Sequence, residues 1–471
     1  MSSAKYINFF RKTKYFMMFI TVLFVYIGAL YSGPVVDEDK QIEYNTRNVV
    51  INNYIGFTVS SDTGNWMRLA NNPKLLFENE RVVKDRKLTA GNVGLSKPGC
   101  FIIVFLISKP IDYFIELLSL STQKLFDNVR ESLNTGYKYD GINQTVDDSV
   151  DNLEEFVSTY IAWLIFNTLV IFLSFSLFCK SIGISIFRLS SYSYTGLWLG
   201  VFFIINDITK IYLISPNPGI LNLLSVSLTI YSCHIIQSRS DLKTLFTFSF
   251  LFGILNLFYE IFFAPYIVMI IFFTKEKVLN EKITIIRFLL ELRFYLLSIF
   301  LFLIPYLLWI ICLEIFFGGY FHFGVHDALG FSILNLNFSA ILYRIMNISW
   351  YGYSLGLLSS FPLILILIYF LVYKILSGEL ISFYRDHIFI AINYTFIILL
   401  FFSLYGYTGT RHTIGTILVL LPFLHTITPL KIKNSEGNFV FYSATFFLIY
   451  SIFIARKVFP FGEGILLNPF V

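Results

Sequence analysis

The chain alternates long apolar runs with short polar breaks, except near its beginning. A first apolar run, 15–32, is followed by a hydrophilic segment, 33–97, and only then does the sequence become almost continuously apolar. About twenty consecutive apolar residues are what a helix needs to cross the hydrocarbon core of a bilayer. The pattern therefore predicts an all-α, polytopic membrane protein with one concentrated polar segment after its first helix.

The apolar runs predict about eleven transmembrane helices. The run 245–273 is too long for one helix and has Glu260 near its middle, so it predicts two short helices with Glu260 at the outer turn. The other helices are expected at 15–32, 157–179, 184–206, 220–236, 294–317, 354–373, 387–404, 414–430 and 439–455.

One apolar stretch, 99–120, does not fit a simple crossing. Lys109, Pro110 and Asp112 interrupt it and Glu116 follows, so a full crossing would bury several charges at a considerable cost. We expect an interfacial or partly inserted segment instead. The expected organisation is a cytoplasmic N-terminus and first helix (1–32), an external loop with juxtamembrane helices (33–156) and a multi-helix membrane domain (157–471).

Composition and charge support this reading. Only 14% of the 471 residues are charged, against roughly 25% in soluble domains. Lys and Arg of membrane proteins collect in cytoplasmic loops, which explains the net charge of +5 without a nucleic-acid partner. The basic clusters all fall on one predicted side: 1–14, 180–188, 237–243, 275–293 and 431–433. The segment 33–97 is then external. Abundant Phe, Ile, Tyr, Asn and Lys favour an AT-rich bacterial genome, hence the inner (cytoplasmic) membrane.

The external segment holds the acids that are candidates for catalysis, Asp37 and Asp62. Asp62 precedes Trp66, Leu69 and Ala70, whose near-helical spacing predicts a short helix. Asp62 is equally suited to cap that helix, to act as a general base, or to hold a divalent cation at a phosphate.

Further candidates follow apolar runs on the same predicted face. Asp207 is either part of a polar helix end or a second carboxylate in an external cavity, whereas Glu260 needs a partner or a wet site. Arg411, next to His412, suits phosphate binding through its fork of donors, or anchors a helix at the interface.

No metal site or resident cofactor is predicted, although a divalent cation bound with the substrate is compatible with the sequence. His322 and His326 have a spacing that suits metal binding on a helix, with Asp327 adjacent. The glycines around them indicate a loop instead. The four cysteines are scattered through apolar runs without metal-binding or disulfide spacing.

The layout resembles the GT-C superfamily of membrane glycosyltransferases: an external acidic loop after the first helix, a broken apolar segment, then many spans. The matching pieces are Asp62-x-x-x-Trp66-x-x-Leu69-Ala70, Arg86 and Lys97-Pro98-Gly99. The resemblance implies a polyprenyl-phosphate-linked sugar as donor and a lipid or glycan acceptor. It also implies a catalytic acid in the first outer loop and a basic residue for the lipid phosphate.

Carried onto this chain, the resemblance makes Asp62, Asp37 or Asp207 the catalytic carboxylates. It assigns Arg86, Glu260, Arg411 and His412 to substrate binding. No soluble domain follows the last apolar run, which favours a single-sugar transferase over an oligosaccharyltransferase. The rivals are an O-antigen-type polymerase or ligase, a multipass lipid or polysaccharide transporter, and a non-catalytic assembly protein.

Overall fold

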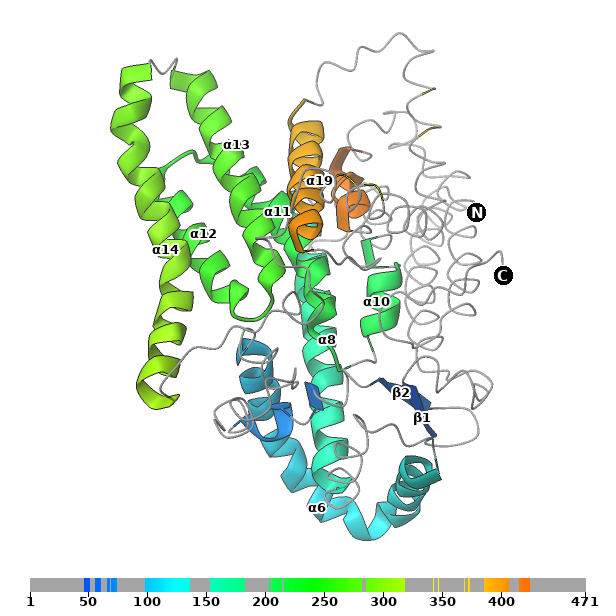
Figure 1. The fold of residues 1–471 in the computed structure, drawn as a ribbon. Coiled ribbons are helices and arrows are strands. Elements are labelled where there is room, and N and C mark those ends of the chain that lie inside the picture. Colours follow the sequence, from blue (N-terminus) through cyan, green and yellow to red (C-terminus); the bar gives the residue numbers. More distant parts are fainter. Residues whose placement is uncertain are drawn as a thin grey trace, which may run out of the picture.

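Long helices form most of the part of the chain that the structure describes (Figure 1). The computed structural model describes residues 46–50, 56–60, 66–67, 69–73, 98–135, 153–182, 203–204, 206–213, 216–281, 285–317, 385–405 and 415–423, together with a few single positions between 342 and 372. Within this part, three helices are long and apolar enough to cross a membrane: Glu154–Ser181, Pro218–Ser238 and Glu291–Ile315. The predicted helical membrane fold is confirmed at this level.

Helix α11, Leu221–Ser238, is the most enclosed of the three. It follows a short 3-10 turn, η3 (Pro218–Ile220), whose start is capped by Asn217: the side-chain oxygen accepts a hydrogen bond from the Gly219 N–H at 2.8 Å. Helix α8, Leu153–Ser181, packs along one side of α11, and α13 packs along another. Because helices surround α11, it can be apolar on all faces.

The run with Glu260 at its middle forms two helices, as predicted. Helix α12 covers Leu242–Asn256 and helix α13 covers Phe263–Glu281, with the 3-10 turn η4, Glu260–Phe262, between them. Asp241 caps α12, because its carboxylate accepts the Thr244 N–H at 2.7 Å. The hydrogen bonds to the Thr244 side chain and backbone hold the pKa of Asp241 below its usual value.

Helix α14, Ile285–Phe317, packs against α12, and helix α19, Arg385–Tyr405, packs against α13. The approach of α12 to α14 is close at Gly253, where an added Cβ would lie 2.3 Å from the Phe302 carbonyl oxygen. Only 17% of the most apolar stretch of α14 is buried inside the protein. Its exposed face carries Leu292, Leu296, Leu297, Ile299, Phe300, Leu303, Leu307, Leu308, Ile311 and Ile315. Such a face suits contact with lipid acyl chains.

Helix α6, Pro98–Thr135, runs without a break through the charged interruption of its apolar stretch. Pro110 lies inside the helix, so one backbone hydrogen bond is missing there. The expected external loop thus contains a long helix, and its segment before α6 contains a two-stranded hairpin that we did not predict. Strands β1 (Thr46–Val50) and β2 (Gly56–Ser60) pair antiparallel, and β1 lies next to α6.

The ends of α8, α11 and α13 that lie near the predicted basic clusters are close together. The Lys180 ammonium at the end of α8 lies over the Tyr231 ring of α11 at 5.2 Å. Gln237 near the end of α11 and Lys275 of α13 both bind Asp386 at the start of α19. This agrees with the expectation that the basic clusters 180–188, 237–243 and 275–293 fall on one side. The opposite end of α8 meets α6, and Figure 1 shows that end lowest in the view.

Candidate functional site

Of the seven predicted site residues, two fall within the described residues. Glu260 is the first residue of η4, in the turn between α12 and α13. Asp207 is the first residue of α10, Asp207–Tyr212. The others lie outside the described part of the chain: Asp37, Asp62, Arg86, Arg411 and His412.

Helix α10 is positioned by two buried asparagines. Asn206, not Asp207, caps the helix: its side-chain oxygen accepts the Thr209 N–H at 3.1 Å, and its amide donates to the Phe203 carbonyl at 2.7 Å. At the other end, the amide of Asn167 in α8 donates to the carbonyl of Tyr212 at 2.6 Å. The backbone at Asp207 is therefore held at a fixed place beside α8.

The turn that carries Glu260 is bound to the beginning of α6. The Gly99 N–H donates to the Leu257 carbonyl at 3.1 Å, and the Cys100 thiol donates to the Phe258 carbonyl at 3.2 Å. Gly99 is required there because an added Cβ would lie 2.6 Å from the Phe258 ring. Glycine thus lets the first turn of α6 meet the hairpin turn directly.

The same end of α6 holds a short helix from the external segment. Residues 66, 67 and 69–71 are helical, as their spacing predicts, and Trp66 is only 8% exposed. Its ring stacks on Phe101 of α6 at a centroid distance of 5.1 Å and an angle of 13°. Met67, Leu69 and Ala70 are buried as well. The external segment therefore reaches the same turn of α6 that contacts the hairpin of Glu260.

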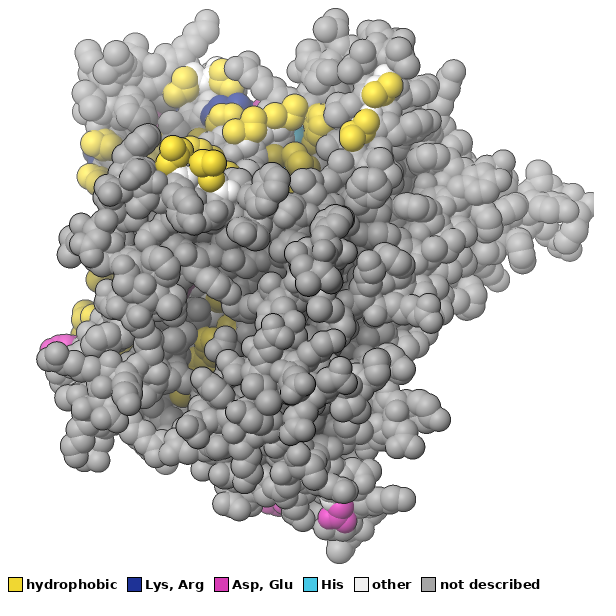
Figure 2. Space-filling view, turned by 45° about the vertical axis from the view of Figure 1, so that its right-hand side comes forward, with side chains coloured by type: hydrophobic (Ala, Val, Ile, Leu, Met, Phe, Trp, Pro, Cys, Tyr) yellow, Lys and Arg dark blue, Asp and Glu magenta, His cyan; other side chains and the backbone are white. Residues whose placement is uncertain are grey.

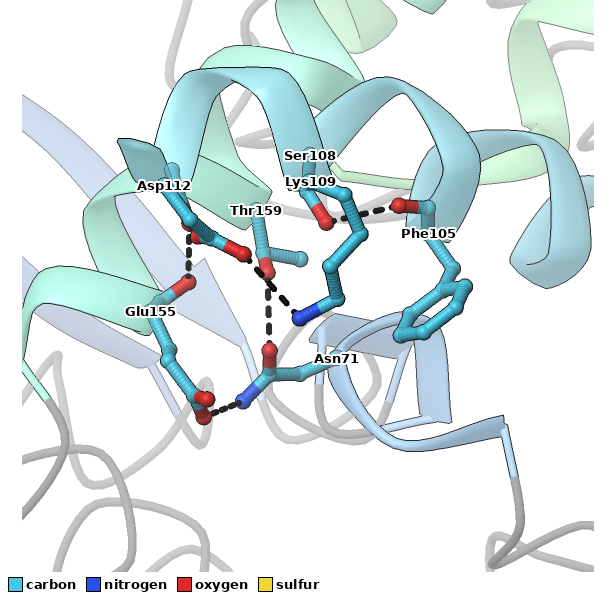
Figure 3. Close-up of polar contacts among 8 residues, drawn as sticks. Asn71, Phe105, Ser108, Lys109, Asp112, Glu155 and Thr159 are labelled. Atoms are coloured by element: carbon cyan, nitrogen blue, oxygen red, sulfur yellow. Dashed lines mark hydrogen bonds and ion pairs between the residues drawn. The ribbon is translucent and has the colours of Figure 1, made fainter. Parts of the chain in front are cut away.

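Polar contacts continue this attachment towards the start of α8 (Figure 3). The amide of Asn71 donates to a Glu155 carboxylate oxygen at 2.9 Å, and the Thr159 hydroxyl donates to the Asn71 side-chain oxygen at 3.3 Å. Glu155 lies in the first turn of α8, where a negative charge interacts favourably with the helix dipole. Asn71 thus uses both ends of its amide to join the short helix to α8.

A charged pair on α6 lies beside these residues. The Lys109 ammonium binds the Asp112 carboxylate at 3.0 Å and lies over the Phe105 ring at 4.8 Å. The buried Ser158 hydroxyl of α8 donates to the other Asp112 oxygen. The side chain of Lys109 remains 45% exposed and that of Asp112 21% exposed. We call the six polar residues the rim cluster: Asn71, Lys109, Asp112, Glu155, Ser158 and Thr159.

The rim cluster was not among the predicted sites. In the sequence, Lys109 and Asp112 stand out only as charges that interrupt an apolar stretch, and Glu155 only as an acid just before the apolar run 157–179. Their i, i+3 spacing on one helix was the signal that the two charges neutralise each other. Chemically, the cluster offers an accessible ammonium for an anion and carboxylates for proton transfer. Its two hydroxyls are buried and hold Asp112 and Asn71 in place.

Neither metal-binding residues nor known proteins add to this site. Across the described ranges, no group of three or more His, Cys, Asp or Glu side chains is placed to hold a metal ion. His322, His326 and Asp327 lie outside those ranges. No protein-family model matches the chain, and no curated protein or solved structure is detectably similar to it.

Proposed function

We propose that the protein is a membrane glycosyltransferase with about eleven spans. It would move a sugar from a polyprenyl-phosphate donor to a lipid or glycan acceptor on the non-cytoplasmic face of a bacterial inner membrane. The observation that supports this most is the attachment of the external segment to the helix bundle. Trp66 and Asn71 attach a polar loop to α6 and α8 next to the rim cluster.

The proposed side of the membrane follows from the charges. The ends of α8, α11 and α13, with the start of α19, lie together and carry basic residues, so the positive-inside rule assigns them to the cytoplasm. The rim cluster contacts the first turns of α8, at the opposite end of that helix. Water-requiring chemistry at the rim cluster would then take place outside, where lipid-linked sugars of this class are used.

In the proposed reaction, a carboxylate deprotonates an acceptor hydroxyl, which attacks the anomeric carbon while the polyprenyl phosphate leaves. Asp62 is four residues before Trp66, and four residues of chain span at most about 14 Å. It is therefore within reach of the surface on which Trp66 is seated, and Asp37 is the alternative base. Arg411, Arg86 and His412 would bind the phosphate, with a divalent cation as an optional aid. A single displacement inverts the anomeric centre.

Three described residues extend this proposal. Lys109 is accessible and positively charged at the rim, so it is a further cation for the donor phosphate. Glu260 would contribute to substrate binding, because its turn is bound to the first turn of α6. Asp207 would be a second catalytic carboxylate.

The test is a transfer assay with purified protein in lipid nanodiscs and a panel of polyprenyl-phosphate sugars. We expect Asp62→Asn to lower the rate by about 10²–10⁴-fold, the contribution of a general base. Asp241→Asn is the matched control, since Asn caps a helix as well as Asp does. Full activity of both Asp62→Asn and Asp37→Asn would refute the catalytic assignment.

The rivals predict different products. An O-antigen-type polymerase or ligase would extend or transfer a whole polysaccharide, which gel analysis of the product separates from addition of one sugar. A transporter would form no new glycosidic bond with any donor but would move a labelled lipid-linked glycan across a sealed vesicle. Absence of transfer across the panel, together with such movement, would overturn the proposal.

A further inference from the structure

A second cluster of charged side chains lies at the basic end of the bundle, away from the rim cluster. Lys275 of α13 forms ion pairs with Glu276, at 3.0 Å, and with Asp386 at the start of α19. The amide of Gln237 in α11 donates to the other Asp386 oxygen at 2.9 Å. Three helices that are distant in sequence therefore meet at one carboxylate. On the upper edge of the face in Figure 2, Lys or Arg atoms lie among hydrophobic side chains, with acidic and His atoms close by.

Lys275 is largely enclosed by its partners. Its side chain is 13% exposed, and its ammonium lies 4.7 Å from the ring centre of Phe272 and 5.3 Å from that of Phe389. One ring belongs to α13 and the other to α19, so cation–π attraction acts across the same helix contact as the ion pair. Lys275 thus contributes to the α13–α19 contact through its charge, its hydrogen bonds and its packing.

The cluster is built to keep Lys275 charged. Burial lowers the pKa of Lys275, but hydrogen bonds to Asp386 and Glu276 and their negative charges raise it above the usual value overall. His387 directly follows Asp386, and both Asp386 and His234 act electrostatically on it. In the described part of the chain, the titratable groups that interact with Lys275 are Asp386, Glu276 and Cys233.

Beneath the cluster lies a native cysteine that can report on it. Cys233 of α11 is fully buried and lies within electrostatic range of both Lys275 and Glu276. It directly precedes His234. Cys233 lies four residues before Gln237, which binds Asp386, and eight residues after Ser225, which contacts Tyr394 of α19. It therefore lies on the side of α11 that α19 contacts, so movement of α19 away from this end would expose it.

We propose that Lys275 and Asp386 form an interhelical clamp that closes α19 over α11 and α13 and shields Cys233. The clamp is a conformational device: paired, it holds the start of α19 in place, and unpaired, it lets that end open. Residues Arg411 and His412 follow α19 in sequence by only a few positions. The state of the clamp therefore bears on the helix that leads to them. This inference does not depend on the proposed glycosyltransferase activity.

The physical argument is that breaking a buried ion pair costs more free energy than forming it contributes. Removing one partner of a buried pair leaves the other desolvated and unpaired, which costs far more than the pair contributes. Asp386 is 33% exposed, so water relieves part of this penalty on its side, whereas Lys275 is more enclosed. After loss of the Asp386 carboxylate, Lys275 keeps its pair with Glu276 within α13 but no longer has a charged partner on α19. After loss of the Lys275 ammonium, Asp386 keeps only its hydrogen bond from Gln237. Either loss should therefore open the contact between α13 and α19.

The test is thiol labelling of the full-length protein in nanodiscs with N-ethylmaleimide, followed at each cysteine by peptide mass spectrometry. Lys275→Met and Asp386→Asn should accelerate labelling of Cys233 by roughly tenfold or more through local opening. Cys179, buried in α8, is the internal reference and should keep its rate. Lys277→Met, a neighbouring lysine of α13 outside the ion pairs with Asp386, is the matched control and should leave Cys233 protected.

A charge exchange separates the clamp from general loss of folding. In the double variant Lys275→Glu with Asp386→Lys, the ammonium moves to α19 and can still pair with Glu276. We expect it to restore most of the protection of Cys233. The proposal is overturned if both single variants label Cys233 within about twofold of wild type. It is equally overturned if Cys179 accelerates in parallel and the double variant does not recover.

Discussion

The close approach of α12 to α14 at Gly253 gives the sharpest prediction, the effect of Gly253→Ala. A Cβ at position 253 would lie 2.3 Å from the Phe302 carbonyl oxygen and 3.0 Å from its carbonyl carbon. Carbon and oxygen atoms normally approach to about 3.3 Å. The two helices must therefore separate by about 1 Å where α12 packs against α14. Small residues at such membrane-helix contacts serve to allow this approach.

The magnitude is set by two opposing effects. Overpacking costs about 1–3 kcal/mol, and the upper end applies because the obstacle is backbone, which cannot rotate away. Alanine in place of glycine inside a helix stabilises the helix by about 1 kcal/mol, which offsets part of this cost. We therefore expect a net loss of about 2 kcal/mol in the free energy of unfolding. The hairpin of α12 and α13 should also shift, and with it the turn of Glu260.

The assay is unfolding in mixed micelles with increasing SDS, followed by tryptophan fluorescence. Gly415→Ala is the matched control, since its nearest obstacle is a methyl group of Val226 at 3.3 Å. We expect that change to be well under 1 kcal/mol. Adding Phe302→Ala should not rescue Gly253→Ala, because the clash is with the main chain. If Gly253→Ala proves as stable as wild type, the α12–α14 packing described above is wrong.

Three further changes test other contacts. Gly99→Ala should destabilise the protein by about 1–3 kcal/mol. Unlike Gly253→Ala, it should be partly rescued by Phe258→Ala, because the obstacle is the Phe258 ring. Equal stability of the single and double variants in the SDS assay would contradict this. Asn71→Asp places a like charge against Glu155, so hydrogen exchange of the short helix that carries it should accelerate; unchanged exchange would show that this contact is not made. The pKa of Lys275 is raised in the folded state, so its stabilisation is fully present below the unfolded lysine pKa of about 10.4 and is lost only as pH rises through the higher folded value. The difference in melting temperature between wild type and Lys275→Met should accordingly stay constant from about pH 7 to 9, and a decline within that window would refute the argument.

The sequence anticipated those features that depend on local length and spacing. An apolar run too long for one helix, with an acid at its middle, correctly predicted the α12–α13 hairpin with Glu260 in its turn. The spacing of Trp66, Leu69 and Ala70 likewise predicted a short helix with a buried face. In both cases the information lies within about thirty consecutive residues.

Features made by distant residues were not predictable. Nothing local indicates that Trp66 stacks on Phe101, or that Asn71 binds Glu155 and Thr159. Lys109 and Asp112 looked costly for a membrane segment because their mutual pairing was not considered. Strand β1 was missed because the external segment was read as one polar stretch, although its Thr and Val residues suit a strand. The assignments of Asp62, Asp37, Arg86, Arg411 and His412 stay predictions.

The hydrogen bond from Gly99 to Leu257 also has a consequence for biosynthesis. The two residues are separated by 158 positions (257 − 99), so a ribosome adding about 5–20 residues per second makes them roughly 8–30 s apart. During that interval the first turn of α6 has no hairpin to bind. The contact between α6 and the turn after α12 can therefore form only after α12 and that turn have been synthesised. A nascent chain arrested before residue 257 should lack this contact, although the partners of Trp66 and Asn71 in α6 and α8 are already present.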